Sequence, residues 1–373
     1  MKIGIFTLHS TTNYGGALQT YALSQILKEM GHDPEIVCYC NDETISWTRK
    51  IIGIITTYSF RNLFFLIKEF ANRIIKQNNN NYIDQRQEIF NNFYRKKLVY
   101  TERIWTKQLP KFVMKYDVLI TGSDQVWTDL YTNNLIYFFD KLDMFKGKRI
   151  SYAACSAHEK APIYNRAVLK TLLTKFNAIS VRDNTTAKLV KNVSGLNSVI
   201  VGDPTILYDF GDFSNTFVMD EPYIFCYFLG KEPTMGHYNV LKKIKTVYGN
   251  IKVVVIAYPG SKILEYADVI IDRASPLEWV GFIAQSAFVY TDSFHSVLFS
   301  LKYHKPFMAY YGEIIRASRF LSLRKEYSLE NRITNKLEQV DLEKEIKWDF
   351  IDSKLNEIRI FSLNFLRSAL STM

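Results

Sequence analysis

Residues 1–39, MKIGIFTLHSTTNYGGALQTYALSQILKEMGHDPEIVCY, decide the fold. Residues 2–8 form a short apolar run that is typical of a buried strand, and a polar turn containing two glycines follows it. Apolar residues then recur at helical spacing over 17–30, and Pro34 leads into a second strand at 35–39. This order of strand, loop, helix and strand builds parallel α/β sheets.

The same order of elements recurs and predicts two domains. Strands that alternate with predicted helices are expected at 116–121, 150–154, 178–182 and 198–201, and again at 223–228, 251–257, 269–271 and 288–291. Residues 208–222, rich in Asp, Ser, Gly and Pro, separate the two series. We therefore predict an α/β fold with a first domain at 1–210, a second at 211–340 and amphipathic helices at 341–373 that pack across both. A length of 373 residues agrees, because a domain averages about 150 residues.

The positive charge of the chain is concentrated in one segment. Lys and Arg number 47 against 37 Asp and Glu, a formal net charge of +10, and residues 45–115 hold 14 of the basic and 4 of the acidic residues. The segment also has 13 aromatic residues, including Trp47, Phe64, Phe65, Phe93, Tyr94 and Trp105. Such a mixture suits an anionic membrane interface or a lipid-diphosphate acceptor. The alternative is a helical insertion packed by its aromatic residues and solvated by its lysines.

Composition excludes several classes of protein. A hydrophobic content of 47% with 16 Gly and 9 Pro is globular rather than disordered or collagen-like. Four cysteines are too few for a disulfide framework, and the N-terminus has no signal-peptide pattern, so we expect a cytoplasmic protein, placed at the inner face of the membrane if residues 45–115 bind lipid. The longest apolar stretch, 51–67, contains five polar residues and is a poor membrane-spanning segment.

Two loops of the first domain follow predicted strands and carry polar or glycine residues. Asn13, Tyr14, Gly15 and Gly16 precede the first helix, where a helix N-terminus can bind an anion or a ligand can approach the backbone. The alternative is a tight turn that needs glycine. Ser123, Asp124 and Gln125 follow the strand at 116–121, with Trp127 as a stacking surface for a sugar. The alternative there is a helix N-cap.

Cations and a histidine follow other strands. Arg182 ends the strand at 178–182 and can hold a carboxylate or phosphate, or form a salt bridge with Asp183. Ser293 and His295 lie where a strand enters a helix, and His295 there can act as an acid or base, although a lone histidine is more often structural. Arg316 and Arg319 can complete an anion site or be solvated surface charges. The histidines and cysteines have no metal-ligand spacing and no G-x-S-x-G is present, so we predict no metal site and no serine-hydrolase triad.

Seven ordered blocks resemble the polysaccharide pyruvyl transferase family. They are NYGGALQTYAL at 13–23, DVLITGSDQVW at 117–127, ISYAA at 150–154, ISVRD at 179–183, GDPTIL at 202–207, SPLEWVGFIAQSAFVYTDSFHS at 275–296 and RASRFLSL at 316–323. The resemblance covers roughly residues 1–330. It implies two Rossmann-like domains that face each other across a cleft, as in GT-B glycosyltransferases, with 45–115 as a basic aromatic helical insertion in the first.

The resemblance also implies an activity. Such enzymes transfer the pyruvyl group of phosphoenolpyruvate, as a ketal, to a sugar of an envelope polymer, capsule or exopolysaccharide precursor, and that sugar is often lipid-linked. Phosphoenolpyruvate is then a co-substrate bound by the second domain, no cofactor is needed, and the first domain faces the acceptor. By this reasoning Arg182, Ser293, His295, Arg316 and Arg319 bind the donor. The acceptor contacts are Asn13, Tyr14, Gly15, Gly16, Ser123, Asp124 and Gln125, and His295 and Asp124 are the candidate catalytic groups.

Two other functions are compatible with the sequence. A GT-B glycosyltransferase that uses a nucleotide sugar would have the same architecture, because a fold does not fix a reaction. A non-catalytic scaffold for polysaccharide assembly is the second alternative. Nucleic-acid binding would explain the net charge, but the chain has no recognised nucleic-acid module and we predict none.

Overall fold

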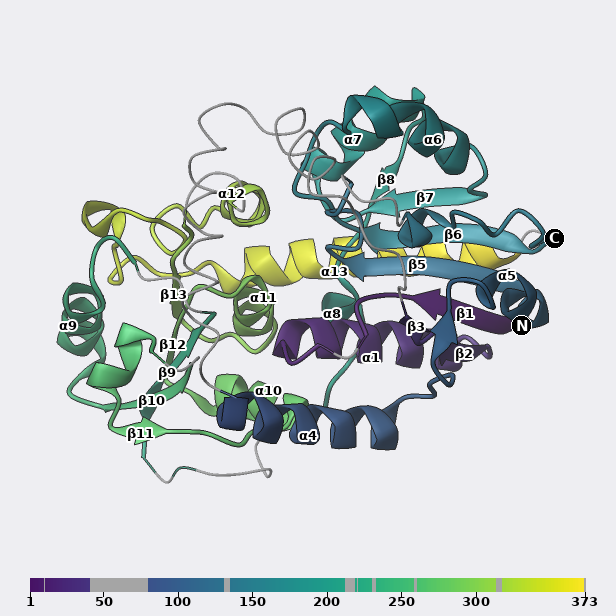
Figure 1. Cartoon of the computed structure of the whole chain (residues 1–373). Helices are drawn as coiled ribbons and strands as arrows, with labels where there is room; N and C mark the ends of the chain where they lie inside the picture. The colour runs from purple at the N-terminus through teal and green to yellow at the C-terminus, as the bar shows by residue number, and fades with distance from the viewer. Residues whose placement is uncertain are drawn as a thin grey trace.

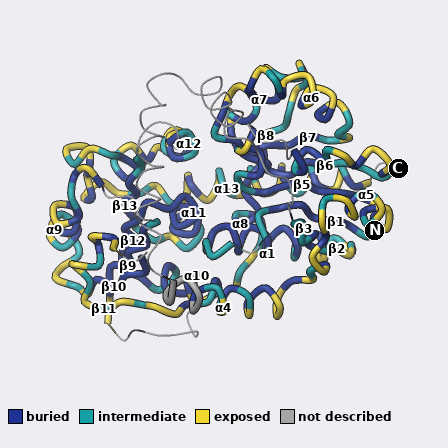
Figure 2. Tube along the Cα trace, in the orientation of Figure 1, coloured by how far each residue is buried: buried dark blue, intermediate teal, exposed yellow. Residues whose placement is uncertain are grey.

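The chain forms two parallel β-sheets with helices packed around them (Figure 1). The computed structural model describes residues 1–9, 11–40, 80–130, 135–211, 219, 221–229, 233–257, 260–312 and 317–371. Figure 2 shows that buried chain runs through the strands of both sheets, whereas exposed turns lie on outer helices such as α6 (Ile163–Leu173) and α9 (His237–Tyr248).

The first sheet has the strand order β2-β1-β5-β6-β7-β8, and every neighbouring pair is parallel. Its strands are β1 (Lys2–Phe6), β2 (Asp33–Ile36), β5 (Val118–Asp124), β6 (Lys148–Ala154), β7 (Ala178–Val181) and β8 (Val199–Ile200). A short separate pair, β3 (Tyr39–Cys40) and β4 (Ile104–Trp105), lies beside it. The apolar runs in β1, β5 and β6 are buried because helices cover both faces of a parallel sheet.

The second sheet has the order β11-β10-β9-β12-β13, again parallel. Its strands are β9 (Tyr223–Phe228), β10 (Lys252–Ala257), β11 (Val269–Ile270), β12 (Phe288–Thr291) and β13 (Phe307–Ala309). All six residues of β9, YIFCYF, are buried, as expected for the central strand of a covered sheet. The expected α/β architecture of two parallel sheets is confirmed.

Several helices begin at capping residues in the loops that follow strands. Asn13 accepts a hydrogen bond from the Gly16 amide at the start of α1 (Tyr14–Glu29), and Asp183 does the same for α7 (Asn184–Ser194). Ser293 caps α11 (Phe294–Lys302). These side chains satisfy amides that the first helical turn leaves unpaired, so they fix where each helix begins. The other helices are α5 (Leu109–Phe112), α8 (Pro204–Leu207), α10 (Pro276–Gln285) and α12 (Ser318–Glu326).

The two halves share a core of aromatic side chains. Tyr14 of α1 stacks on Trp279 of α10 with ring centroids 5.3 Å apart, and its hydroxyl donates a hydrogen bond to the carbonyl of Ala274 at 3.0 Å. Tyr227 of β9 packs edge-on against both rings. Tyr14 comes from the first half and its partners from the second, so the interface is built like a protein interior.

The last helix, α13 (Trp348–Ser371), contacts both halves. Asp352 lies 2.7 Å from Nε2 of His304, just after α11, and Ser362 accepts a hydrogen bond from the Gly202 amide of the first half. Lys148 of β6 donates to two carbonyls near the end of α13. Figure 1 shows this helix, in yellow, extending from the second half to the first sheet.

Three local predictions differ from the structure. Helix α1 begins at Tyr14 rather than near residue 17, because Asn13 supplies the cap, so Gly15 and Gly16 lie in its first turn. Gly122, Ser123 and Asp124 complete β5 instead of forming the loop after it. The segment expected as several helices at 341–373 contains one long helix, α13.

The basic insertion lies partly outside the described residues, including Trp47, Phe64 and Phe65. Its described part contains α4 (Asn80–Lys97), which packs Phe90, Phe93 and Tyr94 into the main core. Lys96 and Lys97 at the end of α4 are exposed, and Trp105 of β4 is 47% exposed. Helix α4 therefore fits the alternative of a helical insertion that is packed by its aromatic residues and solvated by its lysines, because Phe93 and Tyr94 are core residues. Among the described helices, none has the length and apolar character needed to cross a bilayer.

Candidate active site

The candidate site lies where the strand order of each sheet reverses. β1 lies between β2 and β5, and β9 lies between β10 and β12. Ligands of open parallel sheets bind at the carboxyl ends of strands at such points. Here the helices that follow these strands meet: Gly15 of α1 lies against His295 of α11, so closely that a Cβ at Gly15 would be 2.0 Å from Nδ1 of His295. The two reversal points therefore form one site.

Arg182 links two carboxylates at this site. Its Nη1 donates to Oδ2 of Asp203 at 2.7 Å, and its Nη2 donates to Oδ1 of Asp124 at 3.0 Å. All three side chains are largely buried, with exposed fractions of 3% for Arg182, 1% for Asp203 and 14% for Asp124. The predicted alternative partner, Asp183, caps α7 and accepts a hydrogen bond from the Cys155 thiol. Arg182 therefore belongs to the buried cluster and not to a local surface pair.

His295 brings the second half into the cluster. Its Nε2 lies 3.4 Å from Oδ2 of Asp203, close enough for charge attraction, but the pair is not aligned as a hydrogen bond and Nε2 makes none with the described residues. The side chain is only 6% exposed. A buried ring nitrogen without a hydrogen-bond partner costs free energy unless a ligand or water completes it.

A second arginine lies beside the first. Nη1 of Arg319, on α12, is 3.8 Å from Oδ1 of Asp124, and the guanidinium groups of Arg319 and Arg182 both lie over the ring of Phe294, at 5.1 and 4.9 Å from its centroid. The ring face attracts both cations, and the Asp124 carboxylate lies between their charges. Phe294 and Asp124 thus allow two arginines to be buried side by side.

The electrostatics of the cluster favour its ionised form. Burial alone would raise the pKa of Asp124, but Arg182, His295 and Arg319 outweigh it and hold that pKa below its usual value. Burial is likewise overcome at Asp203, where His295, Arg182 and the Thr205 amide hold the pKa far below normal. Burial and the charge of Arg182 lower the pKa of Arg319. The cluster has two permanent cations, a histidine and two carboxylates, so an added anion must compete with the carboxylates for the arginines.

The residues at the start of α1 that were predicted to contact the acceptor have different roles in the structure. Gly15 contacts His295, and the Asn13 side chain and the Gly16 amide are joined in the cap of α1. Tyr14, expected at the acceptor site, is 2% exposed and occupied by the Ala274 hydrogen bond, so its side chain serves the interface between the halves.

Of the residues predicted for the site in and near β5 and α11, the structure brings some into the cluster and places others elsewhere. Asp124 joins the cluster, Ser123 is buried with a hydroxyl that has no hydrogen-bond partner in the described part of the chain, and Gln125 is partly exposed. Trp127, expected to stack on a sugar, is fully buried against Phe138, and its indole N–H donates to the Tyr137 carbonyl; it is a core residue because β5 continues further than expected. Ser293 caps α11, and Arg316 lies outside the described residues.

Sequence reasoning did not single out Asp203 as a site residue. It occurs in Gly202-Asp203-Pro204, after β8, where its Oδ1 caps the short helix α8 by accepting from Thr205. A polar residue at the carboxyl end of a strand of the predicted sheet was the available signal. Its partner His295 lies 92 positions later in the chain and in the other half, so spacing could not pair them.

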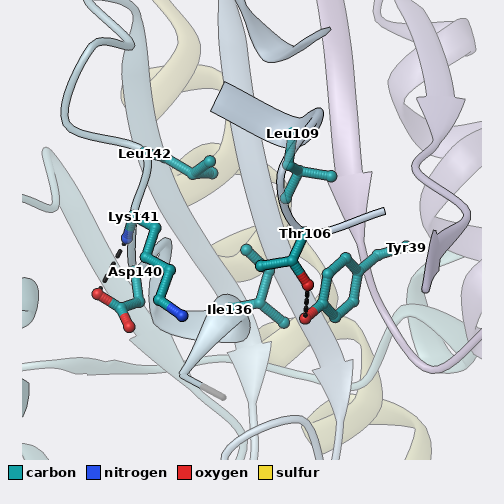
Figure 3. Close-up of a pocket in the computed structure, with 7 residues that line it drawn as sticks. All are labelled: Tyr39, Thr106, Leu109, Ile136, Asp140, Lys141 and Leu142. Carbon is teal, nitrogen blue, oxygen red and sulfur yellow. Dashed lines mark hydrogen bonds between the residues drawn. The ribbon is translucent and has the colours of Figure 1, made fainter. Parts of the chain in front are cut away.

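Other hollows of the surface lie away from this cluster. Figure 3 shows a pocket of about 10 Å³ lined by Tyr39, Thr106, Leu109, Ile136, Asp140, Lys141 and Leu142, where the Tyr39 hydroxyl lies 3.3 Å from Oγ1 of Thr106. A larger depression of about 420 Å³ lies between α9 and β10. Neither is lined by a residue of the His295 cluster. In the described ranges, no three His, Cys, Asp or Glu residues are grouped to hold a metal ion.

Comparison with known proteins agrees with the motifs. The family model described as polysaccharide pyruvyl transferase matches residues 13–313, which include every described residue of the cluster except Arg319. The chain belongs to this family. Members of the family are transferases of polysaccharide biosynthesis, and the match spans most of both sheets. No curated protein sequence matches the chain.

Solved structures share the architecture. UDP-GlcNAc 2-epimerase from Methanocaldococcus jannaschii is 14% identical, with a TM-score of 0.51, over 97% of this chain and 99% of that one. UDP-N-acetylglucosamine 2-epimerase from Rickettsia bellii is 12% identical, with a TM-score of 0.48, over 99% of this chain and 98% of that one. At such low identity the first likeness shows the fold alone. The fold of this pyruvyl transferase family member is the GT-B arrangement of two Rossmann-like halves.

Proposed function

We propose that the chain transfers the pyruvyl group of phosphoenolpyruvate to two hydroxyls of a saccharide and releases phosphate. The observation that carries the proposal is the buried group of Arg182, Arg319 and His295 at the junction of the two halves. Phosphoenolpyruvate has a carboxylate and a phosphate, and two arginines can hold both by paired hydrogen bonds. Nε of Arg182 and Nε2 of His295 are buried without hydrogen-bond partners among the described residues, which leaves donors for such a ligand.

The chemistry assigns a role to each group. A proton from His295 to the methylene carbon of the enol makes a methyl group and leaves an oxocarbenium-like carbon. A sugar hydroxyl attacks this carbon and gives its proton to Asp124, and the C–O bond to phosphate then breaks with both electrons on phosphate. A second hydroxyl closes the ketal, and its proton leaves with the phosphate. The proton taken up by Asp124 then returns to His295 through solvent, which restores both groups. The facing cations keep Asp124 ionised and make it a weak base, which suffices because a hydroxyl that has added to the oxocarbenium-like carbon is strongly acidic.

A lipid-linked acceptor fits the charge distribution of the chain. The excess of basic residues lies in 45–115, and Lys96 and Lys97 at the end of α4 are exposed there. A diphosphate headgroup or an anionic bilayer would be attracted to this segment. The donor cations are separate from these lysines, since they are buried between the halves.

The decisive experiment incubates the full chain with phosphoenolpyruvate and a panel of saccharide acceptors. Phosphate release together with a new ketal methyl signal in the NMR spectrum supports pyruvyl transfer. Nucleotide release from UDP-sugars, without ketal formation, would instead support a GT-B glycosyltransferase, and no turnover of either donor would favour a scaffold.

Substitution of His295 tests its role. Proton transfer by a positioned group contributes about 10²- to 10⁴-fold, so we expect His295→Ala to lower turnover by that factor with the fold intact. His304→Ala is the matched control, because His304 lies just beyond the other end of α11 and pairs with Asp352 at the surface. Unchanged turnover in His295→Ala would remove His295 from the mechanism.

A further inference from the structure

The two carboxylate oxygens of Asp203 have different contacts: one caps a helix and the other faces the site. Oδ1 accepts from the amide and the hydroxyl of Thr205, at 3.1 and 2.8 Å, and so caps α8. Oδ2 accepts from Arg182 at 2.7 Å and faces Nε2 of His295 at 3.4 Å. The side chain is 1% exposed, so the cap holds one oxygen and thereby aims the other into the cluster. A negative charge buried this deeply is stable only because charged partners surround it.

The contact with His295 crosses between the two halves of the chain. Asp203 and Arg182 follow strands of the first sheet, whereas His295 follows β12 of the second. The charged groups that surround this part of the site are Asp203, Asp124, Arg182 and Arg319, and the Gly15 backbone covers the Nδ1 side of the ring. Of the two carboxylates, Asp203 is the one within ion-pair distance of the ring.

The geometry of the contact suits a residue that positions the ring without consuming its proton. Oδ2 of Asp203 lies within ion-pair distance of Nε2 at 3.4 Å, and Nε2 has no hydrogen-bond partner among the described residues. Nε2 therefore remains available to a ligand. The same oxygen accepts from Arg182 at 2.7 Å, so one carboxylate oxygen contacts both the arginine and the ring.

We propose that Asp203 is the positioning residue of the site: its carboxylate holds the His295 ring against Gly15 and sets its position relative to Arg182. The proposal rests on the proposed function, because that function makes His295 a proton donor whose ring must be positioned. Asp203 touches no reacting atom, and it acts through His295 and Arg182. A role limited to capping α8 is the alternative, and the two make different predictions for Asp203→Asn.

Asp203→Asn separates the two roles because asparagine caps a helix about as well as aspartate but has no charge. We expect kcat for phosphate release to fall about 10²-fold, as for a catalytic group displaced by about 1 Å, with KM for phosphoenolpyruvate unchanged or lower because Arg182 loses a competing anion. A loss of kcat without a rise in KM is the expected signature, because Asp203 positions the ring but does not itself bind the donor.

Asp183→Asn is the matched control. Asp183 is also a buried aspartate that caps a helix of the first half, but it makes no ion pair with Arg182 or His295. We expect this control to keep the kcat and the KM of the wild type. Equal losses of kcat in both variants would overturn the proposal and leave Asp203 a structural cap.

A measurement without substrate keeps this inference separate from the reaction. The ring signals of His295 in ¹⁵N-histidine NMR at one fixed pH, assigned by their loss in His295→Ala, should change position in Asp203→Asn and keep their wild-type position in Asp183→Asn. Unchanged signals in Asp203→Asn would overturn the positioning role whatever the substrate is. Changed signals in a chain that releases no phosphate from phosphoenolpyruvate would instead refute the proposed function and retain the role of Asp203.

Discussion

Gly15→Ala should inactivate the site by displacing His295. A Cβ at residue 15 would lie 2.0 Å from Nδ1, 2.3 Å from Cγ and 2.7 Å from Cβ of His295. Ordinary van der Waals contact begins at 3.4 Å, so the ring and the first turn of α1 must separate by about 1.4 Å, the difference between 3.4 and 2.0 Å. A misplacement of about 1 Å can cost about 10²-fold in rate, and we therefore expect kcat to fall at least 100-fold.

The effect on stability should be small by comparison. Gly15 lies in the first turn of α1, and alanine is favoured over glycine in helices by up to about 1 kcal/mol, which offsets part of the strain. The ring has little room to retreat because it is buried between Phe294 and the cluster. Separation of α1 from α11 would in turn disturb the stack of Tyr14 on Trp279.

The assay is phosphate release from phosphoenolpyruvate, measured beside thermal unfolding. Gly31→Ala is the control: Gly31 follows the other end of α1 with φ of 81°, and a Cβ there meets nothing within 4 Å. We expect the control to lose about 1 kcal/mol of stability from the left-handed backbone and to keep its kcat. A folded Gly15→Ala protein with kcat within about threefold of the wild type would refute the reasoning, because it would show that the ring position does not matter.

Tyr14→Phe leaves the buried Ala274 carbonyl without its donor, and we expect the free energy of unfolding to fall by roughly 1–3 kcal/mol in chemical denaturation; an unchanged value would contradict the role of Tyr14 between the halves. Burial lowers the pKa of His158 to about 4, so the unfolded chain binds a proton that the folded chain does not between pH 6.5 and about 4, and stability should fall by up to ~3 kcal/mol as the pH drops through this window. His158→Gln should flatten that slope, and an equally steep slope in the variant would assign it to other groups. We expect the wild-type chain to float with anionic vesicles at low salt and to be released from them at high salt. The double variant Lys96→Glu, Lys97→Glu should bind the vesicles more weakly. Absence of flotation of the wild-type chain at low salt would contradict membrane attachment through the basic insertion.

The fold could be predicted because the strands and helices are recognisable from local patterns of apolar residues. The run in β9 and the helical spacing in α1 depend on neighbours within a few positions, and the repeated order of elements then restricts the topology. Helix starts were less certain, since α1 begins three residues early through the side chain of Asn13.

The site could be predicted only in part. Arg182, Asp124 and His295 lie at or just after the carboxyl ends of strands, and that position together with the family resemblance identified them. Their pairing could not be predicted, because it depends on how two halves meet. Tyr14 and Trp127 are aromatic residues near strand ends and were predicted for the site on that basis, but tertiary packing buries both. The local sequence does not determine which side of a loop faces the core.

The return of α13 to the first sheet has a consequence during synthesis of the chain. Gly202 of the first half donates its amide to Ser362, 160 positions later, and Lys148 reaches carbonyls more than 220 positions later. At about 5–20 residues per second, a ribosome needs roughly 8–32 s to bridge the shorter of these separations. Throughout that interval the first half is on the ribosome without the helix that completes it. The apolar surface that α13 covers, including Tyr152, stays uncovered during that interval, and slower translation of the second half would lengthen that exposure.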